Sequence, residues 1–173
     1  MKALRLSISL LITFLVLLSA CSNNTDSTPT PTATPTQTFE PVTLQLEPTG
    51  EAWSDKFMQG LSGRTSLEGG MLFDFEDTVT FGFQMKETLI PLSIAFISEE
   101  FLIVDILDME PLTAEHYGPS ASYRYAIEVN QGFFTQNNIA VADRVEFQPS
   151  TVEGYISIVF FVTDSKANHK SFN

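Results

Sequence analysis

Cysteine and histidine are scarce in this sequence, which has one cysteine and two histidines among 173 residues. A chain with a single cysteine forms no internal disulfide, and Cys21, His116 and His169 do not make up the ligand set of a structural zinc site. Neither histidine lies near a serine in a nucleophile motif, because Gly60-Leu61-Ser62-Gly63 is one glycine short of the hydrolase pattern. We therefore predict no metal and no cofactor, and we identify no catalytic residue.

Basic residues are also few, since 9 lysines and arginines stand against 21 aspartates and glutamates, giving a formal net charge of −12. A surface of this sign repels the phosphate backbone of nucleic acids. We therefore exclude nucleic acid as a main partner. The charge also fits an ordinary role in keeping the protein soluble.

The apolar stretch at the N-terminus, Leu6–Ala20, is shorter than the roughly 20 residues that a membrane-spanning helix needs. It follows the basic segment Met1–Arg5, and this combination is typical of a secretory signal peptide. We place the signal peptide at residues 1–20. A plain signal anchor followed by an incidental cysteine is the alternative.

The predicted signal peptide ends in Leu18-Ser19-Ala20-Cys21, which resembles a bacterial lipobox. The resemblance implies cleavage before Cys21, a thioether-linked diacylglycerol on its sulfur and an acyl chain such as palmitate on its amine. Two or more acyl chains attach a protein stably to a membrane. We therefore expect lipidation at Cys21, membrane lipid as a partner, and a lipoprotein on the extracytoplasmic side of the cell membrane or outer membrane.

The segment after Cys21 is rich in threonine and proline. Pro29, Pro31 and Pro35 alternate with threonine, and no large apolar side chain is present up to residue 38. Such a segment buries too little surface to fold, and its prolines favour an extended spacer. We expect residues 21–38 to be a disordered linker and residues 39–173 to form a single β-rich domain.

Alternating apolar and polar residues predict strands through most of this domain. The expected strands are 42–46, 71–75, 79–85, 92–97, 101–107, 123–129, 145–147 and 155–162. We expect 71–75 and 79–85 to pair side by side. Trp53, Phe57 and Leu61 recur every four residues and predict one short helix, while 132–138 fits either a short helix or a loop. The predicted fold class is all-β, a compact sandwich or barrel.

Four blocks of this domain carry a family resemblance: Gly60–Arg64, Gly70–Phe73, Met85–Leu92 and Glu128–Gly132. Their order and spacing resemble the bacterial and archaeal family called domain of unknown function 192, over about residues 44–147. The resemblance implies a compact, mostly β domain with one short helix, often secreted or lipid-anchored. Because the family's activity is not established, the resemblance leaves the function open.

The sequence departs from the family pattern at three polar positions. Gln84, Glu87 and Ser93 stand where the family usually has tryptophan, asparagine and aspartate. The strand expected at 155–162 lies beyond the usual end of the family and is interpreted as an addition.

Charged residues near these blocks suggest a candidate binding site. We expect Arg64 at the helix end, Lys86 after the apolar run, and Glu128 on the polar side of its strand to gather at one rim, with Thr88 nearby. Two cations beside aromatic neighbours would suit a small anionic or polyol ligand. A salt-bridged cluster that fixes the helix against the sheet is the competing interpretation.

A second group of carboxylates, Asp74, Glu76 and Asp77, falls between two expected strands. Three carboxylates could hold Ca²⁺, but no calcium-loop pattern accompanies them. We interpret them as a solvated acidic turn.

These observations favour a membrane-anchored binding or interaction module for a small ligand or envelope component. The alternative is an extracytoplasmic enzyme acting on envelope polymer or glycan, which paired carboxylates in a cleft would support. A structural envelope component without a pocket is a third interpretation.

Overall fold

The computed structural model describes residues 40–163, which form a mostly β structure with two short helices. The elements are β1 (Val42–Pro48), α1 (Asp55–Gln59), β2 (Gly70–Val79), β3 (Phe83–Gln84), β4 (Leu92–Ile97), β5 (Ile103–Met109), β6 (His116–Tyr117), β7 (Tyr123–Asn130), α2 (Phe133–Gln136), β8 (Arg144–Pro149) and β9 (Ile156–Phe161). The all-β fold class predicted from the sequence is confirmed. The segment that fitted either a helix or a loop forms α2.

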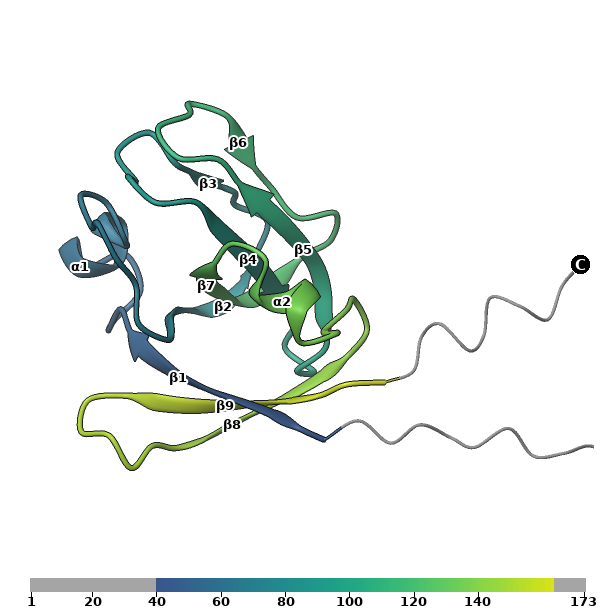
Figure 1. Cartoon of the computed structure of the whole chain (residues 1–173). Helices are drawn as coiled ribbons and strands as arrows, with labels where there is room; N and C mark the ends of the chain where they lie inside the picture. The colour runs from purple at the N-terminus through teal and green to yellow at the C-terminus, as the bar shows by residue number, and fades with distance from the viewer. Residues whose placement is uncertain (1–39, 164–173) are drawn as a thin grey trace, which may run out of the picture. The chain divides into compact units, whose positions relative to one another are not determined.

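Seven of the strands make one curled sheet in the order β5-β4-β7-β2-β1-β9-β8. All neighbours are antiparallel except β1 and β2, which are parallel. Figure 1 shows β1, β8 and β9 together at one end of this sheet, with β4, β5 and β7 toward the other. The expected C-terminal strand is therefore present as β9, paired on both sides.

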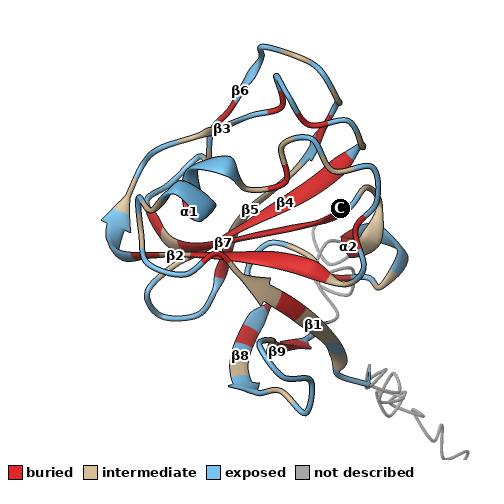
Figure 2. Cartoon of the chain, turned by 90° about the vertical axis from the view of Figure 1, so that its left-hand side faces the viewer, coloured by how far each residue is buried: buried red, intermediate tan, exposed pale blue. Residues whose placement is uncertain are grey.

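The central strands are buried on both faces. In β4, Ile94 and Phe96 face one hydrophobic cluster, and Ala95 and Ile97 face a second one. Figure 2 shows the resulting runs of buried residues along β2, β4 and β7. Residues of α1, β3 and β6 complete the first cluster, and residues of α2, β8 and β9 complete the second. A strand covered on both sides reads as nearly continuous apolar sequence, as β4 does.

The expected side-by-side pairing of 71–75 with 79–85 is wrong. β2 pairs with β1 and β7, while β3 pairs with β6 in a separate two-stranded sheet, here called the β3–β6 ribbon. The aromatic side chains still meet, because the ribbon lies against the sheet face: the rings of Phe73 and Phe83 are 5.1 Å apart. The three acidic residues predicted as a turn lie within β2, where the pairing with β7 shifts and Glu76 has φ of 64°.

The first helix is shorter than the periodicity predicts. Ser54 caps it by accepting a hydrogen bond from the backbone of Phe57, and Gly60 ends it with φ of 51°. Glycine adopts a positive φ more easily than any other residue, which suits it to this place. Trp53 precedes the helix with φ of 65°, and Leu61 follows it. Trp53, Phe57 and Leu61 still lie close to one another, although only Phe57 is helical.

The predicted signal peptide (1–20), lipidated Cys21 and linker (21–38) lie outside the described residues. Among residues 40–163, no helix is both long and apolar enough to cross a membrane.

Candidate ligand-binding pocket

The structure pairs the Arg64 side chain with a residue outside the predicted site. Its guanidinium forms an ion pair with Glu47 of β1 at 2.8 Å, and Lys56 of α1 contacts the same carboxylate at 3.1 Å. The hydrogen bond from Arg64 lowers the pKa of Glu47. Arg64 and Lys56 thus fasten α1 and the segment after it to β1 through Glu47, a residue that the predicted salt-bridged cluster did not include.

Lys86 is exposed on the segment after β3, next to the buried Met85. It forms no ion pair with a described residue. The expected meeting of Lys86 and Arg64 with Glu128 is therefore not seen as a set of salt bridges in residues 40–163.

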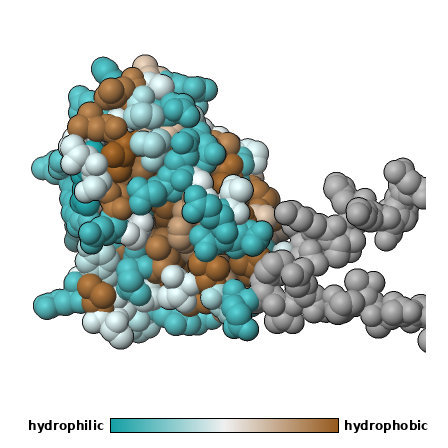
Figure 3. Space-filling view, in the orientation of Figure 1, coloured by the Kyte–Doolittle hydropathy of each residue, from teal (hydrophilic) through white to brown (hydrophobic). Residues whose placement is uncertain are grey.

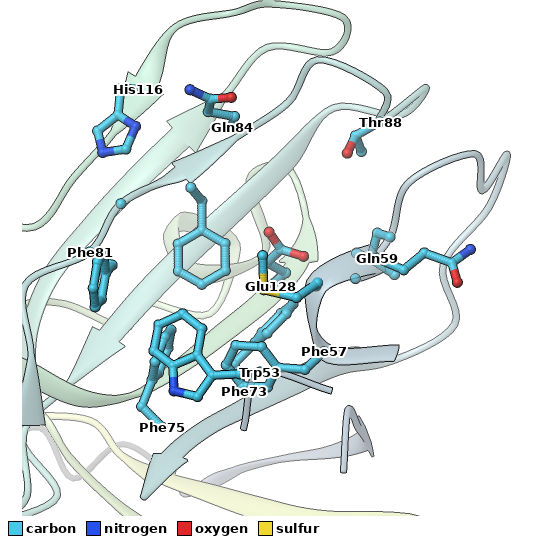
Figure 4. A pocket seen from close by; sticks show the side chains of 15 residues that line it. Trp53, Phe57, Gln59, Phe73, Phe75, Phe81, Gln84, Thr88, His116 and Glu128 are labelled. Carbon is cyan, nitrogen blue, oxygen red and sulfur yellow. The ribbon is translucent and has the colours of Figure 1, made fainter. Parts of the chain in front are cut away.

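Thr88 and Glu128 do come together, because both line a pocket of about 480 Å³ (Figure 4). The pocket lies between α1, the β3–β6 ribbon and the face of the large sheet. Most of its wall is aromatic and apolar, and few groups are polar. The lining residues are Trp53, Phe57, Met58, Gln59, Gly60, Leu61, Phe73, Phe75, Phe81, Gly82, Phe83, Gln84, Thr88, His116 and Glu128.

The aromatic walls are held by edge-to-face contacts. The Trp53 ring lies 5.5 Å from Phe75 and 5.2 Å from Phe81, at interplanar angles of 73° and 78°. Phe57 stands nearly perpendicular to Phe73 and Phe75, at 86° and 90°. Such pairs contribute about 0.5–1.5 kcal/mol each beyond the burial of their area. The rings therefore form a fixed framework with faces turned in several directions.

The mouth of the pocket is apolar and open to solvent. Trp53, Met58 and Phe81 are 51%, 66% and 57% exposed. Figure 3 shows hydrophobic surface beside α1 and β3. The hydroxyl of Tyr123 donates a hydrogen bond of 2.8 Å to the backbone carbonyl of Phe81, which fixes this side of the entrance. Exposed large side chains grouped at a cavity are typical of a binding site.

Glu128 supplies the one carboxyl at the base. It is 5% exposed and its neighbours across the strands are Met71 on β2 and Ile94 on β4, both fully buried. The expectation that Glu128 lies on a polar face is wrong, because both faces of β7 are covered. Burial among apolar side chains raises the pKa of Glu128 to about 8.

The Glu128 carboxyl has no hydrogen-bond partner among residues 40–163, since every side-chain hydrogen bond there joins other groups. Every fully buried polar side-chain atom of the described chain does have a partner. The Glu128 oxygens are therefore not sealed in the core but reach the open space of the pocket. Figure 4 shows the carboxyl between the aromatic side chains and Thr88.

The remaining polar groups surround the upper part of the pocket. Gln59 extends from the end of α1, Gln84 from β3 and His116 from β6. Gly82 lets the ribbon close tightly, since a Cβ there would lie 2.6 Å from Nε2 of His116. Sequence reasoning missed His116 and Gln84 as site residues, because their proximity depends on a two-residue strand pairing.

The lining contains one carboxylate, whereas glycosidases use two at separations of roughly 5–10 Å. It contains no lysine or arginine. The described residues also hold no group of three side chains suited to a metal ion. The arrangement thus provides shape, aromatic surface and one ionisable group, which are the components of a binding pocket.

Comparisons with known proteins show what this chain resembles. A solved structure from Sinorhizobium meliloti 1021, provisionally named a transcription regulator, is 23% identical with a TM-score of 0.54, and the match covers 62% of this chain and 94% of that one. A protein of unknown function from Novosphingobium aromaticivorans DSM 12444 is 28% identical with a TM-score of 0.52, covering 58% and 71%. No curated protein matches significantly.

The family comparison covers every residue that lines the pocket. Residues 34–147 match the model of one family, described as an uncharacterized ACR. β9 follows the matched region. The chain belongs to the domain of unknown function 192 family, DUF192.

Proposed function

We propose that this protein is a lipid-anchored, extracytoplasmic binding module that takes up a small ligand in the aromatic pocket. The observation that carries the proposal is the Glu128 carboxyl, which is buried, unpaired among the described residues and open to a cavity of about 480 Å³. An unpaired buried polar group costs stability. A ligand that supplies the missing partner removes this cost, and the free energy recovered favours its binding.

The single tryptophan of the sequence provides a direct test. Trp53 stands half-exposed at the mouth of the pocket, so a ligand that enters will change its fluorescence. We propose a screen of the full chain in detergent against amines, sugars, small anions and metal salts, read by Trp53 fluorescence and by melting temperature. A ligand at 100 times its Kd stabilises the native state by about 2.7 kcal/mol.

We expect at least one class of compound to change both signals in the native protein. Replacing Phe81 with alanine removes one wall of the entrance and will weaken binding, whereas Glu68→Gln changes an exposed carboxylate outside the lining and will leave it unaltered. If hits bind Phe81→Ala as well as the native chain, the pocket is not the binding site. If no compound changes either signal, the proposed function fails.

A further inference from the structure

The pocket lining holds one carboxyl and one imidazole as its ionisable groups. Glu128 is the one carboxylate among the lining residues, and the lining holds neither lysine nor arginine. Of the nearby basic residues, Arg64 and Lys56 pair with Glu47, and the exposed Lys86 is not among the residues that line the pocket. The whole chain is acidic as well, with a formal net charge of −12. This field attracts cations and repels anions.

The walls of the pocket suit a cation that also carries apolar groups. The rings of Phe75 and Phe81 stand at 73° and 78° to the ring of Trp53, and all three line the pocket. Phe57 and Phe83 line the same space. The face of an aromatic ring carries partial negative charge, so several rings around one space hold a substituted ammonium group by cation–π attraction.

We propose that the pocket binds a small organic cation, a substituted ammonium whose alkyl groups pack against the aromatic rings and whose charge is neutralised by Glu128. The inference rests on the proposed function, since it names the class of ligand for that pocket. Glu128 is at least nine-tenths buried, lacks a partner within residues 40–163 and opens into the cavity. A cationic ligand supplies the counter-charge that the described part of the chain does not.

Other ligand classes match these contacts less well. An anion would place its charge against Glu128 with no lysine or arginine among the lining residues. A neutral sugar would stack on the rings and contact Gln59, Gln84 and Thr88, but it carries no charge to pair with the ionised form of Glu128. The proposed ligand thus differs in charge from the small anionic or polyol ligand expected from Arg64 and Lys86.

Binding of a cation is coupled to a proton. The carboxyl of Glu128, with its pKa raised to about 8 by burial, is mostly protonated at neutral pH in the free protein. A bound cation favours the ionised form, so uptake releases the proton and affinity rises between pH 6 and pH 9. His116 on β6 is the other titratable lining residue, and α1, β2 and β3 contribute none.

The experiment uses the full chain in detergent, with Trp53 fluorescence and calorimetry as readouts. The cationic probes are choline and benzyltrimethylammonium, whose charge does not change with pH. The neutral comparator is 3,3-dimethyl-1-butanol, which has the shape of choline without its charge. We expect both cations to bind, and choline to bind at least tenfold more tightly than its neutral counterpart at pH 8.5.

Variants of the protein test whether Glu128 is the residue that pairs with the cation. Glu128→Gln will lower choline affinity at least tenfold at pH 8.5 and remove its rise with pH, while binding of the neutral alcohol stays the same. His116→Gln will keep the rise with pH, and Glu68→Gln will behave as the native chain. Phosphocholine distinguishes a lipid headgroup from a free organic cation as the source of the ligand. Only a pocket that accepts lipid headgroups will bind phosphocholine as tightly as choline.

The outcomes distinguish the inference from the proposed function. Equal binding of choline and its neutral counterpart, unaffected by Glu128→Gln, would overturn the cation but leave a small-molecule pocket in place. If no cation binds but a compound of another class binds in the broader screen, the cation is likewise overturned and the small-molecule pocket stays in place. Should Glu128→Gln not fold, the comparison of charged and neutral probes on the native chain still decides.

Discussion

At the scale of single residues, Glu128 departs most from what its sequence neighbours suggest. The pattern of β7 places a glutamate between apolar residues, which is typical of a strand with one wet face. In the structure both faces are covered, and Glu128 lies between Met71 and Ile94. Its partners across the strands come from distant parts of the chain, so local alternation does not reveal its burial.

Burial of Glu128 makes the stability of the protein depend on pH. Its pKa is about 8 in the folded state and 4.5 when unperturbed, so the folded state holds the proton more tightly than the unfolded state. The stability linked to this proton is fully present below about pH 4.5 and is lost as pH rises toward 8. Because each pKa unit corresponds to roughly 1.4 kcal/mol, the loss is on the order of a few kcal/mol.

Replacing Glu128 with glutamine removes this loss, because the amide stays neutral at every pH. We expect Glu128→Gln to unfold at a higher urea concentration than the native chain at pH 8.5 and at a similar concentration at pH 5. The exposed Glu68→Gln is the control and should show no gain that depends on pH. A native protein equally stable at both values would contradict the assignment of Glu128 as a buried, ionisable group.

At the scale of elements, the long strands could be predicted, whereas β3 was only part of the expected strand 79–85 and β6 was not predicted. β1, β4, β7 and β9 follow the alternating or continuous apolar patterns expected of strands. β3 and β6 have two residues each, too few for any periodicity, and their pairing is set by contacts across 32 positions of sequence, from Gln84 to His116. The pocket depends on this ribbon. The sequence therefore predicted the aromatic residues as part of the core, but it did not predict that they border an open cavity.

The β3–β6 ribbon depends on the absence of a side chain at Gly82. A Cβ there would lie 2.7 Å from the backbone oxygen of Tyr117, which cannot move aside as a side chain can. We expect Gly82→Ala to lower the free energy of unfolding by about 1–3 kcal/mol, as overpacking usually does. It should also weaken ligand binding, because Phe81 precedes it at the entrance.

The same ribbon contains a matched control for this substitution. A Cβ on Gly118 would come no closer than 3.9 Å to His116, so Gly118→Ala should leave stability nearly unchanged. Urea titrations of the two variants provide the comparison. Similar losses in both would show that the close approach at Gly82 is not what holds the ribbon.

At the scale of the whole molecule, the proposed lipid anchor attaches the protein to a membrane, while the described domain has a separate pocket for a ligand. The family match supports the described domain, while the signal peptide, Cys21 and linker stay predictions from the sequence. Their basis is the order of a basic start, an apolar stretch and a cysteine.

Lipidation at Cys21 can be tested in a bacterial host. We expect the native chain to incorporate labelled palmitate and to have the mass of a protein that begins at a diacylglyceryl-modified Cys21. Cys21→Ser should lose the label, because serine offers no thiol for the thioether, while Ser22→Ala should keep it. A native chain without label, or one cleaved elsewhere, would contradict the anchor and leave the pocket proposals untouched.

The position of β9 also affects when the fold can form. β1 is the first described strand to leave the ribosome and β9 the last, yet the two are neighbours in the sheet. One edge of β1 therefore has no partner until β9 has been made, and β8 also lacks its partner until then. The part of the sheet made by β1, β9 and β8 can therefore close only after β9 has been synthesised, so a nascent chain that stops short of β9 exposes an unpaired strand edge.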